Sequence, residues 1–276
     1  MQFGKAIPAS RRKGPRTLMP RGRVHRNVLG AVVDRTGRGG TTKVRSAFEA
    51  VEARYAAQGL RLTRPVSAEI VRIPIMGAST SSADGHVLHV SARAVGSEML
   101  DGLIAHEMGH MLLTEAGHPS HDARVIERVW RTVDLPRAGQ EVYRQAYNHV
   151  QDVYADDLAF RTDLGDERAY AFFTGWVRNN ASTVSRSRWE NVGRSVGSGF
   201  ALGNLVRRRL VSKDDDLWDA ARAFDRAAGL ESVEGFARFF ESLPTDVSSA
   251  VILERARLLE TLVLDAAKGR AKPRTF

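Results

Sequence analysis

The sequence contains no cysteine, which excludes both disulfide bonds and thiolate metal sites. Any transition metal must then be held by histidine, aspartate or glutamate side chains. The sequence also has no uninterrupted apolar run long enough to span a membrane, and its first residues lack the apolar core of a secretory signal. These absences predict a cytoplasmic protein that does not associate with a membrane.

The composition is that of a folded protein. The chain has 276 residues, of which 43% are hydrophobic and 26% are charged. This length is sufficient for one large domain or two small ones and for a substantial core. The hydrophobic content argues against a largely disordered chain.

Positive charge is concentrated near the N-terminus. Residues 1–45 carry 12 Lys and Arg against one acid, Asp34, whereas the rest of the chain carries 29 bases and 31 acids. Because glycine and proline punctuate residues 1–40 and no apolar period is sustained there, we expect a flexible basic tail, with a short strand at 28–33 as an option. Such a tail suits an acidic partner or nucleic acid, or could cover the domain as an inhibitory segment. No aromatic residue interleaves the bases, so a platform for stacking single-stranded bases is not expected.

The residues that follow the tail predict one domain over 41–276. Apolar residues at helical spacing predict a helix over 42–58, and alternation predicts short strands at 68–75 and 86–90. These strands could form a hairpin around a serine-rich loop, and Pro74 favours an edge position for the first of them.

A central helix is predicted over 97–116, with Ser97 as its N-cap and Gly117 as its stop. Everything after residue 121 has helical periodicity. The chain therefore divides into a sheet with its following helix at 41–117 and a helical half at 118–276, which is an α+β fold that is mostly α. The helices expected in the second half cover residues 121–133, 138–160, 166–179, 189–211, 215–228, 231–242 and 245–268.

The sequence HEMGH at 106–110 lies inside the predicted central helix. His106 and His110 are four residues apart, so both imidazoles lie on one helical face and can reach one metal ion. Glu107 is close to the same ion without having to bind it, and it can take a proton from a metal-bound water. This HExxH spacing predicts a zinc site, Zn²⁺, with Glu107 as the general base.

The motif and its context resemble the zincin superfamily of metallopeptidases over roughly residues 68–160. The metzincin branch has a glycine and a third histidine where this chain has Leu113 and Ala116, so the chain is not of that branch. It is more similar to the gluzincins, in which a later helix supplies a carboxylate ligand and, four residues on, an acid that orients the first zinc-binding histidine. That resemblance implies Asp152 as the third ligand and Asp156 as the partner of an imidazole.

Alternatives to Asp152 remain at this stage. The gluzincin ligand is a glutamate, and the shorter aspartate requires a closer approach of the two helices. His149 would give a three-histidine site instead. Asp156 and Asp157 are further alternatives in the same segment.

Other polar residues near the motif are assigned more ordinary roles. His118 and His121 are expected in a surface loop, and His86 and His89 are expected to be structural on a strand. Tyr154 is a less certain site residue, because it could donate a hydrogen bond to a developing oxyanion. Tyr143 and Tyr147 share that option, although tyrosines at helical spacing more often belong to a core.

The sequence thus predicts a zinc metallohydrolase, in particular a metalloprotease that cleaves a peptide or protein substrate. An amidase acting on another carbonyl compound would use the same activated water. The alternative from a different class is a non-catalytic zincin-like protein that binds nucleic acid or a protein partner through its basic tail.

Overall fold

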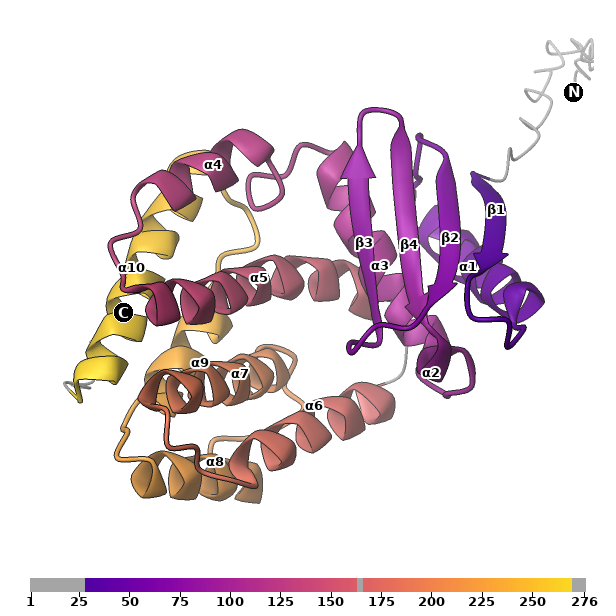
Figure 1. The fold of residues 1–276 in the computed structure, drawn as a ribbon. Coiled ribbons are helices and arrows are strands. Elements are labelled where there is room, and N and C mark those ends of the chain that lie inside the picture. The colour runs from indigo at the N-terminus through magenta and orange to yellow at the C-terminus, as the bar shows by residue number, and fades with distance from the viewer. Residues whose placement is uncertain (1–27, 163–165, 270–276) are drawn as a thin grey trace, which may run out of the picture.

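The computed structural model describes residues 28–162 and 166–269. The N-terminal half is a four-stranded sheet with helices, and the C-terminal half is helical, so the predicted α+β, mostly α architecture is confirmed (Figure 1). The elements of the first half are β1 Leu29–Asp34, α1 Thr41–Ala57, β2 Val66–Val71, β3 Gly77–Ser82, β4 Gly85–Ser91, α2 Ala92–Val95 and α3 Leu100–Glu115.

The sheet has the strand order β1-β2-β4-β3. β1, β2 and β4 are parallel, whereas β3 is antiparallel to β4 and forms one edge. α1 and α3 cover one face of the sheet (Figure 1). Every second residue of β2 is buried, at Val66, Ala68 and Ile70, because alternate side chains of a strand point to the same face. α3 is thereby anchored on a sheet whose edge strand β3 lies next to it.

Three details of the predicted sheet are wrong. The strand β2 is internal, and it pairs with β4 in parallel, so these two strands do not form a hairpin. Pro74 lies beyond the end of β2, so it does not affect the hydrogen bonding of that strand. The serine-rich segment expected as a loop is the edge strand β3, which turns back into β4 after Ser82. Its polar residues show no apolar alternation because its second half is exposed.

The central helix begins later than predicted. Ser97 precedes it in the connection from α2, where its hydroxyl donates to Ala94 O, and α3 starts at Leu100. Ser97 is therefore not the N-cap. The C-terminal end agrees with the prediction, because Gly117 has a φ of 63° that favours glycine after a helix.

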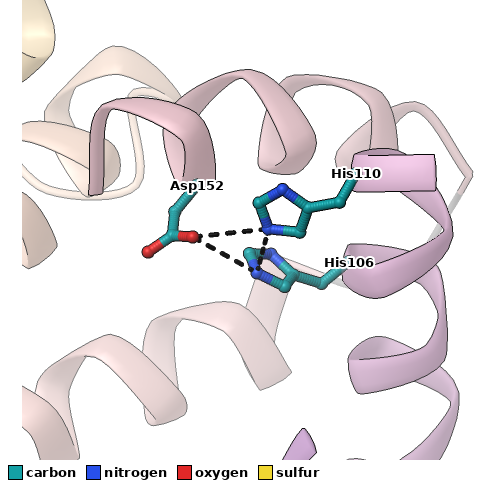
Figure 2. Close-up of side chains that lie close together, drawn as sticks. All are labelled: His106, His110 and Asp152. Carbon is teal, nitrogen blue, oxygen red and sulfur yellow. Dashed lines mark hydrogen bonds and ion pairs between the residues drawn. The ribbon is translucent and has the colours of Figure 1, made fainter. Parts of the chain in front are cut away.

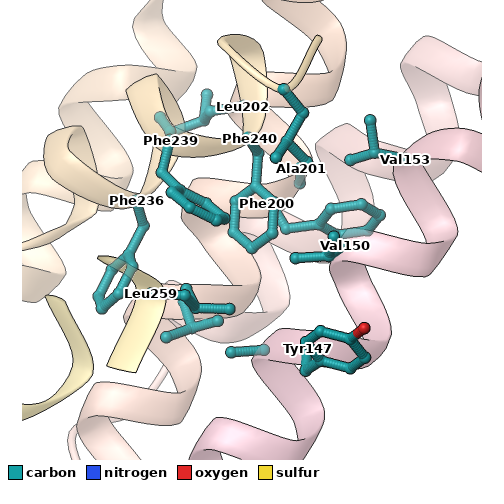
Figure 3. Close-up of a cluster of buried hydrophobic side chains, with 14 of the residues drawn as sticks. Tyr147, Val150, Val153, Phe200, Ala201, Leu202, Phe236, Phe239, Phe240 and Leu259 are labelled. Atoms are coloured by element: carbon teal, nitrogen blue, oxygen red, sulfur yellow. The ribbon is translucent and has the colours of Figure 1, made fainter. Parts of the chain in front are cut away.

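The helical half packs around its own core. Its elements are α4 Ala123–Arg131, α5 Arg137–Ala159, η1 Phe160–Thr162, α6 Asp166–Ala181, α7 Arg188–Arg207, α8 Asp216–Ala227, α9 Val233–Glu241 and α10 Ser249–Lys268. Phe200 of α7 and Phe240 of α9 meet Val150 and Val153 of α5 in this core (Figure 3). The absence of a side chain at Gly199 lets α7 and α9 approach closely. A Cβ at this position would lie only 2.4 Å from the Cβ of Phe236. The long helix α5 thus links this core to α3.

The N-terminal boundary of the domain is also different from the predicted one. β1 pairs with β2, and Leu29 is buried in the sheet core, so the domain includes residues that were assigned to the basic tail. Residues 1–27, which carry most of that tail, lie outside the described residues. The sequence underestimated β1 because this strand is short and has few buried side chains.

We expect that removal of residues 1–39 destabilises the protein. The deletion removes β1, which exposes one edge of β2 and the core residues that Leu29 covers. Burial of a leucine side chain contributes about 1.5–3 kcal/mol to the free energy of unfolding. For a domain of this size this corresponds to a fall in melting temperature of roughly 3–12 °C. Differential scanning calorimetry of chains beginning at Gly40 and at Val28 measures the effect, with the longer chain as the control. Equal melting temperatures for these two chains would contradict the contribution assigned to β1.

Among residues 28–162 and 166–269, no helix has both the length and the apolar character that crossing a membrane requires.

Candidate metal centre

His106 and His110 lie one turn apart on α3, with their Nε2 atoms 3.1 Å apart (Figure 2). The apolar residues around them, among them Ile104, Met108 and Met111, are buried and fix the helix against its neighbours. Two zinc ligands in tetrahedral geometry at ordinary Zn–N lengths are separated by about 3.3 Å. The separation of the two imidazoles therefore suits one shared ion.

Asp152 of α5 faces the two imidazoles (Figure 2). Its Oδ1 lies 3.4 Å from His110 Nε2 and 3.7 Å from His106 Nε2. Among the described residues, these three form a group that could hold a metal ion. One ligand atom from each lies within 4.8 Å of the other two. The structure brings together the three residues that the sequence analysis predicts as metal ligands.

A glycine inside the motif lets the two helices approach closely. A Cβ on Gly109 would lie 2.8 Å from the carbonyl oxygen of Ala155, so a side chain there would push α5 away from α3. The aspartate at position 152 is one methylene shorter than a glutamate. The close contact at Gly109 provides the approach that the shorter side chain requires.

Asp156 holds the first histidine of the motif. Its Oδ1 lies 2.8 Å from His106 Nδ1, and its Oδ2 accepts a 2.6 Å hydrogen bond from Asn204 Nδ2 of α7. An ionised carboxylate can only accept, so the Nδ1 of His106 carries the proton. The lone pair of a neutral His106 is then on Nε2, which faces His110 and Asp152.

His149 stands beside Asp152 and is not part of the three-residue group. Its Nδ1 lies 2.9 Å from Asp152 Oδ2, the oxygen on the far side from the motif histidines. The imidazole is stacked on Phe200 with ring centroids 4.3 Å apart and planes within 5°. The structure therefore places His149 as a support of Asp152, whose second oxygen stays directed at the imidazoles.

The remaining carboxylate of the segment is directed elsewhere. Asp157 forms ion pairs with Arg207 at 2.7 Å and with Arg208 at 3.2 Å, both at the end of α7. Together with the Asp156–Asn204 bond, these pairs fasten α5 to the C-terminal end of α7.

Glu107 is 6% exposed and points toward the edge strand of the sheet. Its Oε2 accepts a 2.8 Å hydrogen bond from the hydroxyl of Ser79 on β3. One carboxylate oxygen is thus fixed by the strand. The sequence alone does not identify Ser79, because it lies in a run of serines and threonines that has no recognisable spacing to the motif.

Charge in the centre favours a bound cation. Burial lowers the pKa of His106, but the nearby carboxylates of Asp156 and Asp152 outweigh this effect and raise the pKa to about 10. Burial raises the pKa of Asp152, yet the adjacent imidazoles of His110 and His149 and the charge of His106 hold it well below its usual range. The carboxylate of Asp152 is therefore ionised and available to a metal ion at neutral pH.

The loop after α3 was expected at the surface, and this expectation is wrong for His121. Its Nε2 lies 2.7 Å from Nδ1 of His110. Burial, followed by the charges of His110 and His118, lowers the pKa of His121 well below its ordinary value. His118 is half-buried against the ring of Tyr154, with centroids 4.7 Å apart, and burial also lowers its pKa. The loop folds back onto α5, which the sequence could not reveal.

The other residues weighed from the sequence have structural surroundings. The hydroxyl of Tyr143 donates to Ala256 O, and burial raises the pKa of all three tyrosines. The hydroxyls of Tyr147 and Tyr154 are buried and have no hydrogen-bond partner among the described residues. His86 lies between Ser81 and Glu115 in the sheet, and His89 is near Glu69.

Comparison with known proteins gives a family but no activity. The family described as "Family of unknown function (DUF5781)" matches residues 36–259, and the chain belongs to it. Neither the curated proteins nor the solved structures contain a match to the chain. The matched region includes α3 and α5, so the candidate metal centre lies within the part that defines the family.

Proposed function

We propose that this member of the DUF5781 family is a zinc-dependent metallohydrolase that cleaves amide bonds in peptides or proteins. The observation that carries the proposal is the arrangement of His106 and His110 with Nε2 atoms 3.1 Å apart, facing the carboxylate of Asp152. Two imidazole nitrogens and one carboxylate oxygen form a donor set typical of catalytic zinc, with a fourth position left for water or substrate.

Different residues would bind the metal, transfer the proton and position the general base. Zinc held by His106, His110 and Asp152 would lower the pKa of water and polarise a substrate carbonyl. Glu107 accepts the proton of the attacking water and delivers it to the leaving amine. Ser79 holds Oε2 of that carboxylate, which leaves Oε1 to meet the water.

The edge strand β3 supports a peptide as the substrate. The bond from Ser91 N to Met76 O, together with the antiparallel register, sets which residues of β3 bond to β4. Backbone groups alternate in direction along such a strand, so those of Gly77, Ser79 and Ser81 are directed to the open edge of the sheet. An extended peptide can pair there by adding a strand. Ser79 also contacts Glu107, so a peptide on this edge would lie beside the general base.

A cavity of about 490 Å³ reaches the centre only through His149, and none of the three candidate ligands lines it. It lies between α5, α6 and α7, and its wall includes His149, which bonds to Asp152. A volume of this size accommodates a large side chain or a short segment of substrate. Its other walls include Val142, Gln145, Trp176, Trp189 and Gly193.

The proposal is tested by incubating the zinc-loaded protein with a peptide library and identifying new termini by mass spectrometry. Cleavage that disappears with a zinc chelator and returns with added zinc supports a metallopeptidase. Hydrolysis limited to small amide substrates would favour an amidase. Bound zinc without any hydrolysis would contradict the catalytic proposal and favour a non-catalytic binding protein, with nucleic acid or an acidic protein as the partner of the basic N-terminal segment.

We predict different effects for Asp152→Ala and His149→Ala. Asp152 faces both imidazoles, so its removal is expected to reduce zinc affinity by more than a hundredfold. His149 touches only the outer oxygen of Asp152, and loss of such a supporting hydrogen bond typically costs about 10–100-fold in affinity. Competition with a chromophoric chelator measures both constants. A larger loss for His149→Ala than for Asp152→Ala would assign the third ligand to His149.

A further inference from the structure

The loop after α3 contains a chain of polar side chains that ends at the second histidine of the motif. His118 Nδ1 lies 2.7 Å from Ser120 Oγ, which lies 2.8 Å from His121 Nδ1. His121 Nε2 then lies 2.7 Å from His110 Nδ1. Three consecutive short hydrogen bonds thus connect His118 to His110.

One backbone group fixes the direction of all these bonds. The N–H of Ser120 donates to His118 Nδ1 at 3.3 Å, so this nitrogen carries no proton and is an acceptor. The hydroxyl of Ser120 must then donate its single proton to His118. Its oxygen accepts in turn from Nδ1–H of His121.

The same assignment of donors and acceptors extends to His110 in the metal centre. A neutral imidazole has one N–H, so Nε2 of His121 is an acceptor once its Nδ1 is the donor. It receives the proton of His110 Nδ1, and the lone pair of His110 remains on Nε2. That atom is the one 3.1 Å from Nε2 of His106 and 3.4 Å from Asp152.

We propose that His121 is a positioning residue that holds His110 in the tautomer and ring orientation required to bind the metal. Ser120 and His118 set the tautomer of His121 itself. This inference rests on the proposed metal site and adds to it the means by which the second imidazole ligand is oriented. None of the three residues contacts the metal in this assignment.

The contacts around these hydrogen bonds indicate that the series from His118 to His110 is in place before a metal ion binds. Ser120 is fully buried, and its carbonyl oxygen accepts a 2.9 Å hydrogen bond from Gln151 Nε2 of α5. The ring of His118 packs on Tyr154, which is also on α5. The loop is therefore tied to the same helix that presents Asp152, so the orientation of His110 and the position of the carboxylate are set together.

The two motif histidines consequently have partners of different charge. His106 donates to the carboxylate of Asp156, whereas His110 donates to a neutral imidazole. A carboxylate partner makes an imidazole a more basic ligand than a neutral acceptor does. With zinc bound, a neutral partner at His110 would limit the negative charge around the ion and so preserve its strength as a Lewis acid.

The test compares His121→Gln with His121→Phe. Glutamine retains an oxygen that can accept from His110 Nδ1, whereas phenylalanine fills similar space without an acceptor. We expect zinc affinity to fall about 10–100-fold in the phenylalanine variant and to be largely restored in the glutamine variant. Ser120→Ala is expected to cause a smaller loss, because His121 keeps its place but can exchange tautomers. His89→Phe, on the sheet, is the matched control, with no expected change in zinc affinity.

A second measurement does not depend on zinc or on activity. Nitrogen-15 NMR of the imidazoles in the metal-free protein is expected to show the Nδ1–H tautomer for His110 in the wild type and a mixture of tautomers in His121→Phe. The Nε2–H tautomer for His110 in the wild type would overturn the proposal, as would equal zinc affinities for the glutamine and phenylalanine variants. If instead the tautomer is as expected and the protein cleaves nothing, the positioning role stands and the peptidase assignment fails.

Discussion

Replacement of His106 or His110 by alanine is expected to abolish stoichiometric zinc binding. Each residue supplies one of the three side-chain donors, and no other described histidine or carboxylate belongs to the group around the site. Loss of a supporting hydrogen bond already costs about 10–100-fold in affinity, so loss of a direct donor should exceed that range. Elemental analysis after dialysis measures the result, with one zinc per chain expected in the wild type.

The matched control for these variants is His89→Ala. His89 is a histidine of the same half of the protein, on β4, and its nearest charged partner is Glu69. It should retain one zinc per chain. Circular dichroism on each variant separates loss of metal from loss of fold. A folded His106→Ala or His110→Ala protein that keeps stoichiometric zinc would place the metal site elsewhere.

Glu107→Gln is expected to retain zinc and fold but to lose hydrolysis. Glutamine has nearly the same shape, and its amide can still accept from the hydroxyl of Ser79, so the packing between α3 and β3 is preserved. It cannot accept a proton from water at neutral pH. General-base catalysis contributes about 10²–10⁴-fold, and kcat should fall by that factor.

Initial rates on a peptide identified from the library, together with zinc content, test this prediction. The exposed Glu98, which precedes α3, provides the control substitution Glu98→Gln, with no expected change in rate. Ser79→Ala should lower the rate less than Glu107→Gln does, because it frees the carboxylate without removing it. Full activity in Glu107→Gln with bound zinc would exclude Glu107 as the base.

Much of the fold could be predicted because its signals are local. The helices from α4 to α10 show apolar periodicity, and glycine or proline marks several of the connections between them, so their positions agree with the prediction within a few residues. The sheet was harder, because strand order depends on contacts between distant segments. The parallel pairing of β2 with β4 and the polar edge strand β3 have no short-range signature.

The sequence by itself determined the spacing of the candidate site. Four residues on a helix place His106 and His110 on one face, and four more on a later helix place Asp152 and Asp156 on one face. These relations hold wherever the helices lie, because they depend only on the helical repeat. Whether the site holds zinc stays a prediction of this spacing.

Only the tertiary structure decided how these faces meet and what supports them. The close contact at Gly109 sets the distance between α3 and α5. The partners of the candidate ligands come from other parts of the chain: Asn204 from α7, His121 from the loop after α3, and Ser79 from β3. Hydrogen bonds of this kind depend on the positions of whole elements and not on sequence spacing, so no local pattern reveals them.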